Sequence, residues 1–281
     1  MEIKAVDVKK LREKTGAGMM DCKKALVEAD GDFKKAEKIL KELGLAAAQK
    51  RGGRVTKEGQ IFSAIKGKSG VLLELSSETD FVAKSKEFVA LGEKLANLII
   101  EKDLKEKNDE INSLITETIG KIKENIDLKR FKILKAGPNE FLINYIHKAD
   151  DVGKIGVLLL INAGDSSLIN NEKVRTAAFD IALHTAAYAP LYLSRKEVDA
   201  DYLKEQEEIF LKQAQNLGKP EKVIQGIVKG KLNKHLSEIC LLDQAFVKDQ
   251  TVTVARYIDN LGKEMGCKIS ISDYLYYKLG E

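Results

Sequence analysis

The sequence predicts an α+β fold, in which a small three-helix domain precedes a core of two related α+β subdomains with small antiparallel sheets. Three observations carry this prediction. Apolar residues recur at helical spacing in three successive segments between residues 5 and 43. Farther along, two pairs of strand-like runs are each followed by a helical pattern, and they contain nearly the same word, GVLLEL at 70–75 and GVLLLI at 156–161. A pair of helical segments is inserted in the second of these halves.

The composition describes a folded, reduced protein. The chain has 281 residues, of which 44% are hydrophobic and 32% charged, enough for two or three domains with a sizeable core. The net charge of +4 is too small to indicate nucleic-acid binding by itself. Cys22, Cys240 and Cys267 lie far apart with no CxxC pair, the N-terminal MEIKAVDVKK has no apolar signal-peptide region, and the apolar runs are too short to span a bilayer. We therefore expect a cytoplasmic protein that does not enter a membrane.

The first domain, residues 1–55, is predicted to contain three short helices and a basic linker. TGAG at 15–18 ends the first helix, because glycine tolerates the positive φ of a helix C-terminus, and DGD at 30–32 caps the third. Such a small bundle is commonly a binding module. Its apolar positions are Ala5, Val8 and Leu11 in the first helix, Met19, Cys22, Leu26 and Ala29 in the second, and Phe33, Ala36, Leu40 and Leu43 in the third.

The stretch AAAQKRGGRVTKEG, at 46–59, reads as a mobile linker because it is basic and contains adjacent glycines. Its cations are Lys50, Arg51, Arg54 and Lys57. They either meet an acidic partner or are simply solvated, and the sequence leaves both interpretations open.

The core is predicted to divide into a first subdomain at 56–139 and a second at 140–281. In the first, a strand pair at 60–65 and 70–75 precedes helices at 85–100 and 105–125 and a strand at 127–134. In the second, a strand pair at 141–146 and 153–161 precedes a helix at 171–187, a helical hairpin at 199–239, a helix at 252–264 and a strand at 268–279. Each half is expected to bury the other's apolar face.

The turn SSETDFVAKS, at 76–85, places an aromatic residue in an otherwise polar segment. If this is only a helix start, Thr79 or Asp80 is the N-cap and Phe81 folds back onto the helix as a staple. If it is a contact site, Phe81 points outward.

Signals for catalysis are weak throughout the chain. TGAGMMDCKKA lacks the third glycine of a dinucleotide-binding loop, and neither a P-loop nor a GxSxG elbow is present. The histidines, His147, His184 and His235, lack metal-ligand spacing. We expect His184 to be a satisfied core residue, whereas His147, which ends a strand, has either a contact role or none. A binding protein without catalytic residues, metal or cofactor is the expected class.

Four segments together resemble the bacterial elongation factor Ts family, the guanine-nucleotide exchange factors of elongation factor Tu. They are VKKLREKTGAGMMDCKKAL at 8–26, ADGDFKKA at 29–36, ETDFVAKSKEF at 78–88 and HTAAYAP at 184–190. The resemblance covers essentially the whole chain. It implies a three-helix N-terminal domain that is ubiquitin-associated-like, followed by two related α+β subdomains and a helical hairpin.

The resemblance also implies a partner-binding site. Thr79, Asp80, Phe81 and Val82 would insert into the GTPase, with Phe81 as a wedge that displaces Mg²⁺ and disturbs the phosphate site, so that GDP leaves and GTP rebinds. Met19, Met20 and Lys23 would dock on the GTPase domain, although Met19 also fits the core spacing. Arg51 and His147 are further expected contacts. No cofactor and no direct nucleic-acid contact are implied.

Other classes remain as alternatives. The many lysines and the basic linker also fit an RNA- or ribosome-binding protein without exchange activity, which would bind RNA with steep salt dependence. A small-molecule enzyme would need a concave pocket with perturbed titratable groups. If the helical module worked as a ubiquitin-associated domain, residues 1–50 alone would bind ubiquitin, and we expect that they do not.

Overall fold

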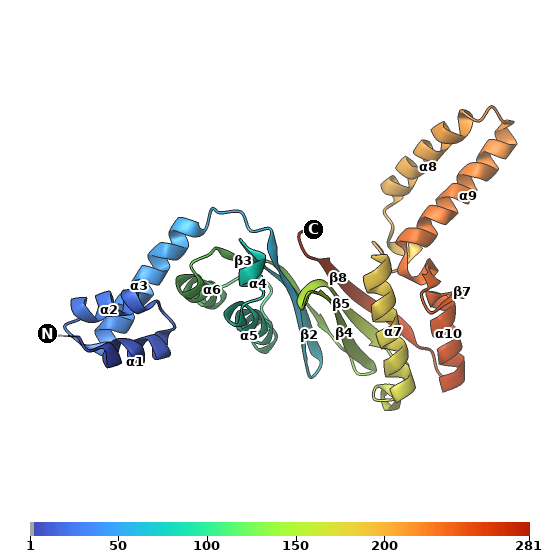
Figure 1. The fold of residues 1–281 in the computed structure, drawn as a ribbon. Helices are drawn as coiled ribbons and strands as arrows, with labels where there is room; N and C mark the ends of the chain where they lie inside the picture. The colour runs from blue at the N-terminus through green and yellow to red at the C-terminus, as the bar shows by residue number, and fades with distance from the viewer. Residues whose placement is uncertain (1–2) are drawn as a thin grey trace.

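Small antiparallel sheets and helices alternate along this α+β chain, as the sequence predicts. The computed structural model describes residues 3–281, with all side chains except those at 47 and 48, and Met1 and Glu2 of the predicted 1–55 domain lie outside the described residues. The molecule is elongated (Figure 1): a helical module lies at the N-terminal end, the sheets lie in the middle, and a helical hairpin projects at the far end.

The N-terminal module consists of α1 (Ala5–Thr15), α2 (Met19–Glu28) and α3 (Phe33–Arg51). Gly16 ends α1 at a φ of 69°, in the left-handed region that glycine favours, and the Asp32 carboxylate accepts hydrogen bonds from the first N–H groups of α3. Both predicted turns are thus confirmed. The buried side chains of the module are Val8, Leu11, Cys22, Ala25, Leu26, Ala29 and Ala36.

Three expectations for this region are wrong. The segment predicted to be a mobile linker begins as helix, since α3 runs on to Arg51 through good helix formers and stops at the glycine pair 52–53. Leu43 is 51% exposed because α3 has by then passed beyond the small bundle and approaches α6 instead, backbone to backbone at Gly44 and Gly120. Met19 is the first residue of α2 and is 43% exposed, so of its two interpretations the core position is the one that the structure contradicts.

Each half of the core contains one three-stranded antiparallel sheet. The first has the order β1-β2-β3, with β1 (Glu58–Lys66), β2 (Ser69–Ser77) and β3 (Ile126–Lys135). The second has the order β4-β5-β8, with β4 (Glu140–Ala149), β5 (Val152–Asn162) and β8 (Ser270–Lys278). The repeated words GVLLEL and GVLLLI therefore form the central strands, β2 and β5. A central strand covered on both faces requires apolar residues at successive positions, which explains these runs.

The two sheets pack face to face and carry helices on their outer faces (Figure 1). Alternate residues of each central strand serve the two interfaces. In β2, Leu73 faces the helices and Leu72 faces the other sheet; in β5, Leu159 and Leu158 do the same. The interface between the sheets contains Ile61, Leu72, Leu134, Leu142, Leu158, Leu160 and Leu275. The expectation that each half buries the other's apolar face is confirmed.

Helices α5 (Lys86–Lys102) and α6 (Asp109–Ile122) cover the first sheet, and α7 (Glu172–Tyr188) and α10 (Val254–Met265) cover the second. Side-chain oxygens cap the N-terminal ends of these helices, from Ser85, Asn108, Asn171 and Thr253 respectively. A short 3₁₀ turn, η1 (Ser166–Leu168), joins β5 to α7, and Leu168 and Ile169 fold back onto the second core.

The inserted hairpin consists of α8 (Ala200–Gln215) and α9 (Glu221–Ile239), which lie side by side and project from the second sheet (Figure 1). Two 3₁₀ turns, η2 (Arg195–Glu197) and η3 (Leu241–Asp243), flank the hairpin. A small ribbon, β6 (Ala245–Phe246) and β7 (Asp249–Thr253), follows and was not predicted. The helix predicted to begin at residue 252 begins at Val254 instead, because Val252 and Thr253 are the last residues of β7.

Within residues 3–281, no helix is both long enough and apolar enough to cross a lipid bilayer.

Candidate partner-binding site

The segment between β2 and α5 contains a helical turn of its own, α4 (Asp80–Ala83). Thr79 is the N-cap of this turn, since its Oγ1 accepts a hydrogen bond from the backbone N–H of Val82 at 3.3 Å. Ser85 caps α5 separately, by accepting from the N–H of Phe88. These two successive caps let the chain turn sharply between β2 and α5. Residues 79–85 therefore form a short rigid corner between strand and helix, which we call the Phe81 corner.

The corner has one apolar face inside the protein and one aromatic side chain outside. Val82 is 9% exposed and Ala83 only 1%, and both pack in the first core. Phe81 is 81% exposed, which contradicts the interpretation in which it folds back as a staple. Asp80 is half-exposed, and its carboxylate lies 3.4 Å from the Nζ of Lys84. Asp80 and Phe81 are thus the residues of the corner that a partner can reach.

Glu124 holds the start of the corner from the segment between α6 and β3. Its carboxylate accepts hydrogen bonds from the backbone N–H of Thr79 at 3.2 Å and from the Thr79 hydroxyl at 3.0 Å. The Thr79 Oγ1 therefore donates to Glu124 and accepts from Val82 at the same time. Bonds to an ionised acceptor are the stronger class of hydrogen bond, so the corner is anchored where it begins.

A second acidic residue extends this anchor. Glu78 accepts a hydrogen bond from the backbone N–H of Asn125 at 2.6 Å and lies 3.4 Å from Nη1 of Arg54. The Asn125 side chain donates in turn to the backbone carbonyl of Arg54 at 2.8 Å. Residues that precede the two edge strands of the first sheet, Arg54 before β1 and Asn125 before β3, thus converge on the corner. This network could not be predicted from the sequence, because its members lie 24 to 71 residues apart.

The candidate contacts of the N-terminal module lie on α2, at the opposite end of the first half from the second sheet (Figure 1). Met20 is 64% exposed and Met19 43%, and Lys23, one helical turn after Met19, is exposed as well. The structure does not bring these residues to Phe81. Arg51 is the last residue of α3 and is half-buried.

The α2 surface is held to the core by contacts with α6 and the residues after it. Asp21 forms an ion pair with Lys123 at 3.1 Å, and the backbones of α3 and α6 touch at Gly44 and Gly120. Lys123 directly precedes Glu124, which anchors the corner. The same short segment after α6 therefore contacts both the N-terminal module and the Phe81 corner.

His147 lies near the end of β4 and is exposed. Its Nδ1 lies 3.2 Å from the hydroxyl oxygen of Tyr145, whose ring packs edge-on against Phe179 with the ring centroids 5.8 Å apart. Phe179, on α7, is 40% exposed. Sequence reasoning missed Tyr145 and Phe179, although the i, i+2 spacing of Tyr145 and His147 on a strand places both on one face.

His184 is a satisfied core residue, as predicted. It is fully buried; its Nδ1 accepts from the backbone N–H of Val247 at 3.1 Å and its Nε2 lies 3.0 Å from Oε1 of Gln244. This pattern fits the neutral ring with the proton on Nε2. Burial lowers the pKa of His184 below its usual value, opposed by the Gln244 hydrogen bond.

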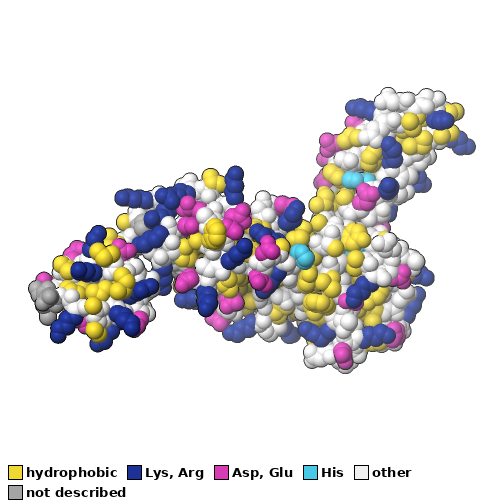
Figure 2. Space-filling view, viewed as in Figure 1, with side chains coloured by type: hydrophobic (Ala, Val, Ile, Leu, Met, Phe, Trp, Pro, Cys, Tyr) yellow, Lys and Arg dark blue, Asp and Glu magenta, His cyan; other side chains and the backbone are white. Residues whose placement is uncertain are grey.

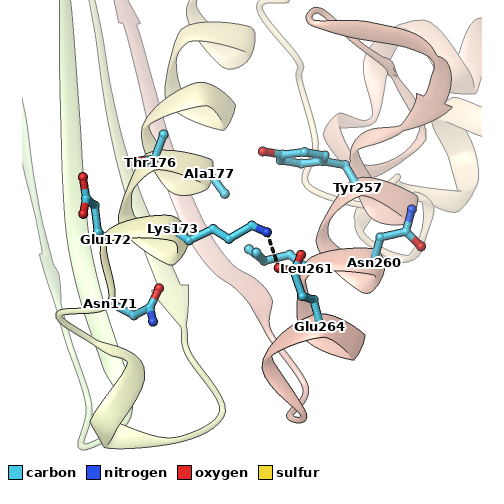
Figure 3. Close-up of a pocket in the computed structure, with 9 residues that line it drawn as sticks. All are labelled: Asn171, Glu172, Lys173, Thr176, Ala177, Tyr257, Asn260, Leu261 and Glu264. Carbon is cyan, nitrogen blue, oxygen red and sulfur yellow. Dashed lines mark hydrogen bonds and ion pairs between the residues drawn. The ribbon is translucent and has the colours of Figure 1, made fainter.

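An open groove of 690 Å³ lies between α7 and α10 (Figure 3). Lys173 and Glu264 pair with each other across it, so these two charges neutralise one another. Burial raises the pKa of Tyr257, which lines the groove. Over residues 3–281, no three His, Cys, Asp or Glu side chains are grouped so as to hold a metal ion.

Charges and apolar side chains are distributed unevenly over the surface. Figure 2 shows lysine and arginine side chains gathered around the C-terminal end of α3 and the linker after it, and hydrophobic side chains gathered on the N-terminal module. Of the cations at the end of α3 and after it, Arg54 is exposed and engaged by Glu78, and Lys50 of α3 and Lys57 are exposed as well.

Comparison with known proteins gives consistent similarities over the whole chain. The model of the family described as Elongation factor TS matches residues 78–281, beginning at the corner itself. Elongation factor Ts of Treponema denticola is 48% identical over 280 residues, covering 100% of this chain and 99% of that protein. The Elongation factor Ts proteins of Borrelia recurrentis and Treponema pallidum are 44% and 42% identical; the alignments cover 100% of this chain and 100% and 99% of those proteins.

Proposed function

The chain belongs to the elongation factor Ts family, and we propose that it is a guanine-nucleotide exchange factor that binds elongation factor Tu with GDP and promotes GDP release. The observation that carries this proposal is the exposure of Phe81, at 81%, on a helical turn whose neighbouring residues are buried or hydrogen-bonded. A large exposed aromatic side chain on a rigid support is suited to insertion into a partner.

The proposed mechanism is displacement of the elements that hold Mg²⁺ and phosphate. Phe81 would enter the GTPase domain near its nucleotide, and Asp80 would help to position it. Mg²⁺ requires near-ideal octahedral geometry, so a small movement of its ligands weakens its binding. The β-phosphate is held by backbone N–H groups of a P-loop, and movement of that peptide weakens the phosphate site too. This chain makes and breaks no covalent bond and is assigned no cofactor.

The exchange follows from thermodynamic linkage. If the factor lowers the affinity of its partner for GDP, GDP lowers the affinity of the partner for the factor by the same ratio. Rebinding of GTP then completes the exchange. A rigid corner matters here, because a loop that yielded on contact would absorb the binding energy that must displace Mg²⁺.

Further contacts would hold the partner from both sides of the corner. Met19, Met20 and Lys23 are proposed to dock on the GTPase domain, with Arg51 as an additional contact. His147 is proposed to contact another domain of the partner. The exposure of Met20 and His147 supports this assignment, and their separation on the molecule fits a partner with several domains. As a translation factor, the protein would act in the cytoplasm.

Val82 has a different place in this proposal. It is buried in the first core, so its contribution to partner binding would be to support Phe81 from below. Thr79 likewise would act through the cap and its bonds to Glu124.

The test is release of a fluorescent GDP analogue from elongation factor Tu. The protein should accelerate release at substoichiometric concentration, since each molecule acts repeatedly. No acceleration, with both proteins folded, would overturn the proposal.

The basic surface around the linker favours a second candidate, RNA or ribosome binding. If the protein binds RNA, its affinity for RNA alone should fall steeply between about 50 and 200 mM salt. Each phosphate contact should lower the logarithm of the binding constant by about one for each ten-fold rise in salt concentration. Exchange activity without such binding would exclude it.

A further inference from the structure

The buried side chain of Gln60 connects the Phe81 corner to the second half of the core. Gln60 lies on β1 and is 5% exposed. Its Nε2 donates a hydrogen bond to the backbone carbonyl of Ala83 at 2.6 Å, and its Oε1 accepts one from the backbone N–H of Gly153 at 3.1 Å. Ala83 ends α4, and Gly153 lies at the start of β5. One amide thus spans both subdomains.

The contact with Ala83 completes the support of the corner. The last carbonyls of a helix lack intrahelical partners and must find others. Ala83 is 1% exposed, so water has little access to the residue, and Gln60 supplies the hydrogen bond. Thr79 and Glu124 hold the N-terminal end of α4 and Gln60 holds its C-terminal end, with Phe81 between them.

The contact with Gly153 lies beside the expected His147 contact. Gly153 pairs with Lys148 across the irregular register that directly follows His147 in β4. A Cβ on residue 153 would lie 2.6 Å from the carbonyl oxygen of Ile61, so only glycine allows β1 to come this close. The close approach of the β1 and β5 backbones at Ile61 and Gly153 therefore brings the Gln60 side chain within hydrogen-bonding distance of the start of β5.

An amide is the neutral side chain that fits this place. It has a donor for the Ala83 carbonyl and an acceptor for the Gly153 N–H at its two ends. A carboxylate would present an acceptor to the Ala83 carbonyl, and an apolar residue would leave both backbone groups without partners.

We propose that Gln60 is a positioning residue for nucleotide exchange, which fixes the Phe81 corner relative to the β4–β5 hairpin, whose first strand carries His147. This inference rests on the proposed function. With Gln60 in place, force on Phe81 from the partner is resisted by both subdomains. Without it, the Thr79 contacts hold only the N-terminal end of α4 by hydrogen bonds, beside the packing of Val82 and Ala83, and part of the binding energy is absorbed in moving the corner.

The first test uses the free full-length protein. Gln60→Met removes both hydrogen bonds at nearly constant side-chain volume. The matched control is Gln244→Met, because Gln244 is also buried, at 3%, and also bridges two groups, His184 and the carbonyl of Glu238. Native-state amide exchange is measured at Ala83, Lys84 and Ser85, whose N–H groups close the α4 turn. Gln60→Met should speed exchange there by about five- to ten-fold, as expected for one lost hydrogen bond, and Gln244→Met should not. Equal exchange in Gln60→Met and the intact protein would overturn the proposal.

The second test measures GDP release at increasing concentrations of the factor. Gln60→Met should lower the maximal rate several-fold and leave the half-saturating concentration nearly unchanged, because the docking surfaces remain. In a Phe81→Ala background, Gln60→Met should have little further effect, since it acts through Phe81. A merely structural role would lower both single and double variants in proportion to their loss of folded protein. Full additivity of the two changes would therefore contradict the proposal.

The two tests separate this inference from the proposed function. If the intact protein fails to accelerate GDP release, the exchange function is wrong, and with it any role of Gln60 in exchange. If the intact protein is active and Gln60→Met loses neither protection at α4 nor maximal rate, the exchange function stands and the Gln60 assignment is wrong.

Discussion

Phe81 and Val82 are adjacent in the chain and lie in opposite environments: the Phe81 side chain is 81% exposed, and Val82 is 9% exposed within the first core. The α4 turn produces this separation, because successive residues of a helix point about 100° apart. The proposed partner contact and a core contact thus lie at neighbouring positions, which makes their effects separable by mutation.

Phe81→Ala should lower the acceleration of GDP release by about ten-fold or more, the effect expected when an aromatic anchor worth ~2 kcal/mol is truncated. Its free energy of unfolding should stay within about 0.5 kcal/mol of the intact protein, because the ring contributes little to the core. Stopped-flow release of the GDP analogue and urea unfolding measure the two effects. A fall in stability with unchanged release would show that the ring is structural.

Val82→Ala is the matched opposite. Deleting two buried methyl groups should cost about 1–3 kcal/mol of unfolding free energy. Release per folded molecule should fall less than in Phe81→Ala. A larger loss of release than of stability would assign Val82 a direct contact with the partner.

Glu124→Gln should loosen the corner at its start. The amide keeps one acceptor but loses the charge that strengthens the bonds from the N–H and hydroxyl of Thr79. We expect faster amide exchange at Val82 and a several-fold lower maximal release rate. Glu93→Gln, an exposed change on α5, is the control and should alter neither quantity. Unchanged exchange at Val82 in Glu124→Gln would show that the cap alone suffices.

His184 should make stability depend on pH. Burial lowers its pKa in the folded state, so below the unfolded value of about 6.5 the unfolded chain binds a proton that the folded chain does not. Stability should therefore fall as the pH falls below about 6.5, with a slope of at most ~1.4 kcal/mol per pH unit from this residue. Urea unfolding between pH 5 and 7.5 measures the slope, which His184→Gln should reduce. Equal slopes in both proteins would contradict the assignment.

Arg130→Ala should weaken the contact between the two sheets and lower the free energy of unfolding. The Glu74 side chain is 4% exposed and accepts from Nε of Arg130 at 2.7 Å and from the N–H of Gly280 at 2.9 Å, while Arg130 donates to the carbonyl of Lys278. Removing the guanidinium leaves a buried carboxylate short of partners, at a cost of about 1.5–3 kcal/mol in urea unfolding. Glu13→Ala, in an exposed pair with Lys9, should cost less than about 1 kcal/mol. Similar costs for both would show that water replaces Arg130.

The regular elements were predictable because their signals are local. The words GVLLEL and GVLLLI revealed two central strands, and the apolar spacing revealed the helices that cover them. The strand β6 has only two residues and so shows no apolar alternation. The β6–β7 ribbon could therefore not be predicted from the sequence. The extension of α3 to Arg51 was missed because basic composition and the following glycines resemble a linker, whereas the residues before them favour helix.

The site was predictable only in part. The residues 76–85 placed Phe81 at a strand–helix junction but did not decide whether it points inward or outward. The supporting contacts join Thr79 to Glu124 and Gln60 to Gly153, which are 45 and 93 residues apart. Such pairings are set by how the subdomains pack, and single-sequence patterns do not contain that information.

The junction between central strand and helix occurs twice in this fold. In the second half, Leu168 and Ile169 of the junction after β5 close over their own core. In the first half, the equivalent junction leaves Phe81 outside. One half of the fold can therefore carry a protruding side chain at this junction while the corresponding junction of the other half stays packed on its own core, so the second core does not depend on the intruding residue.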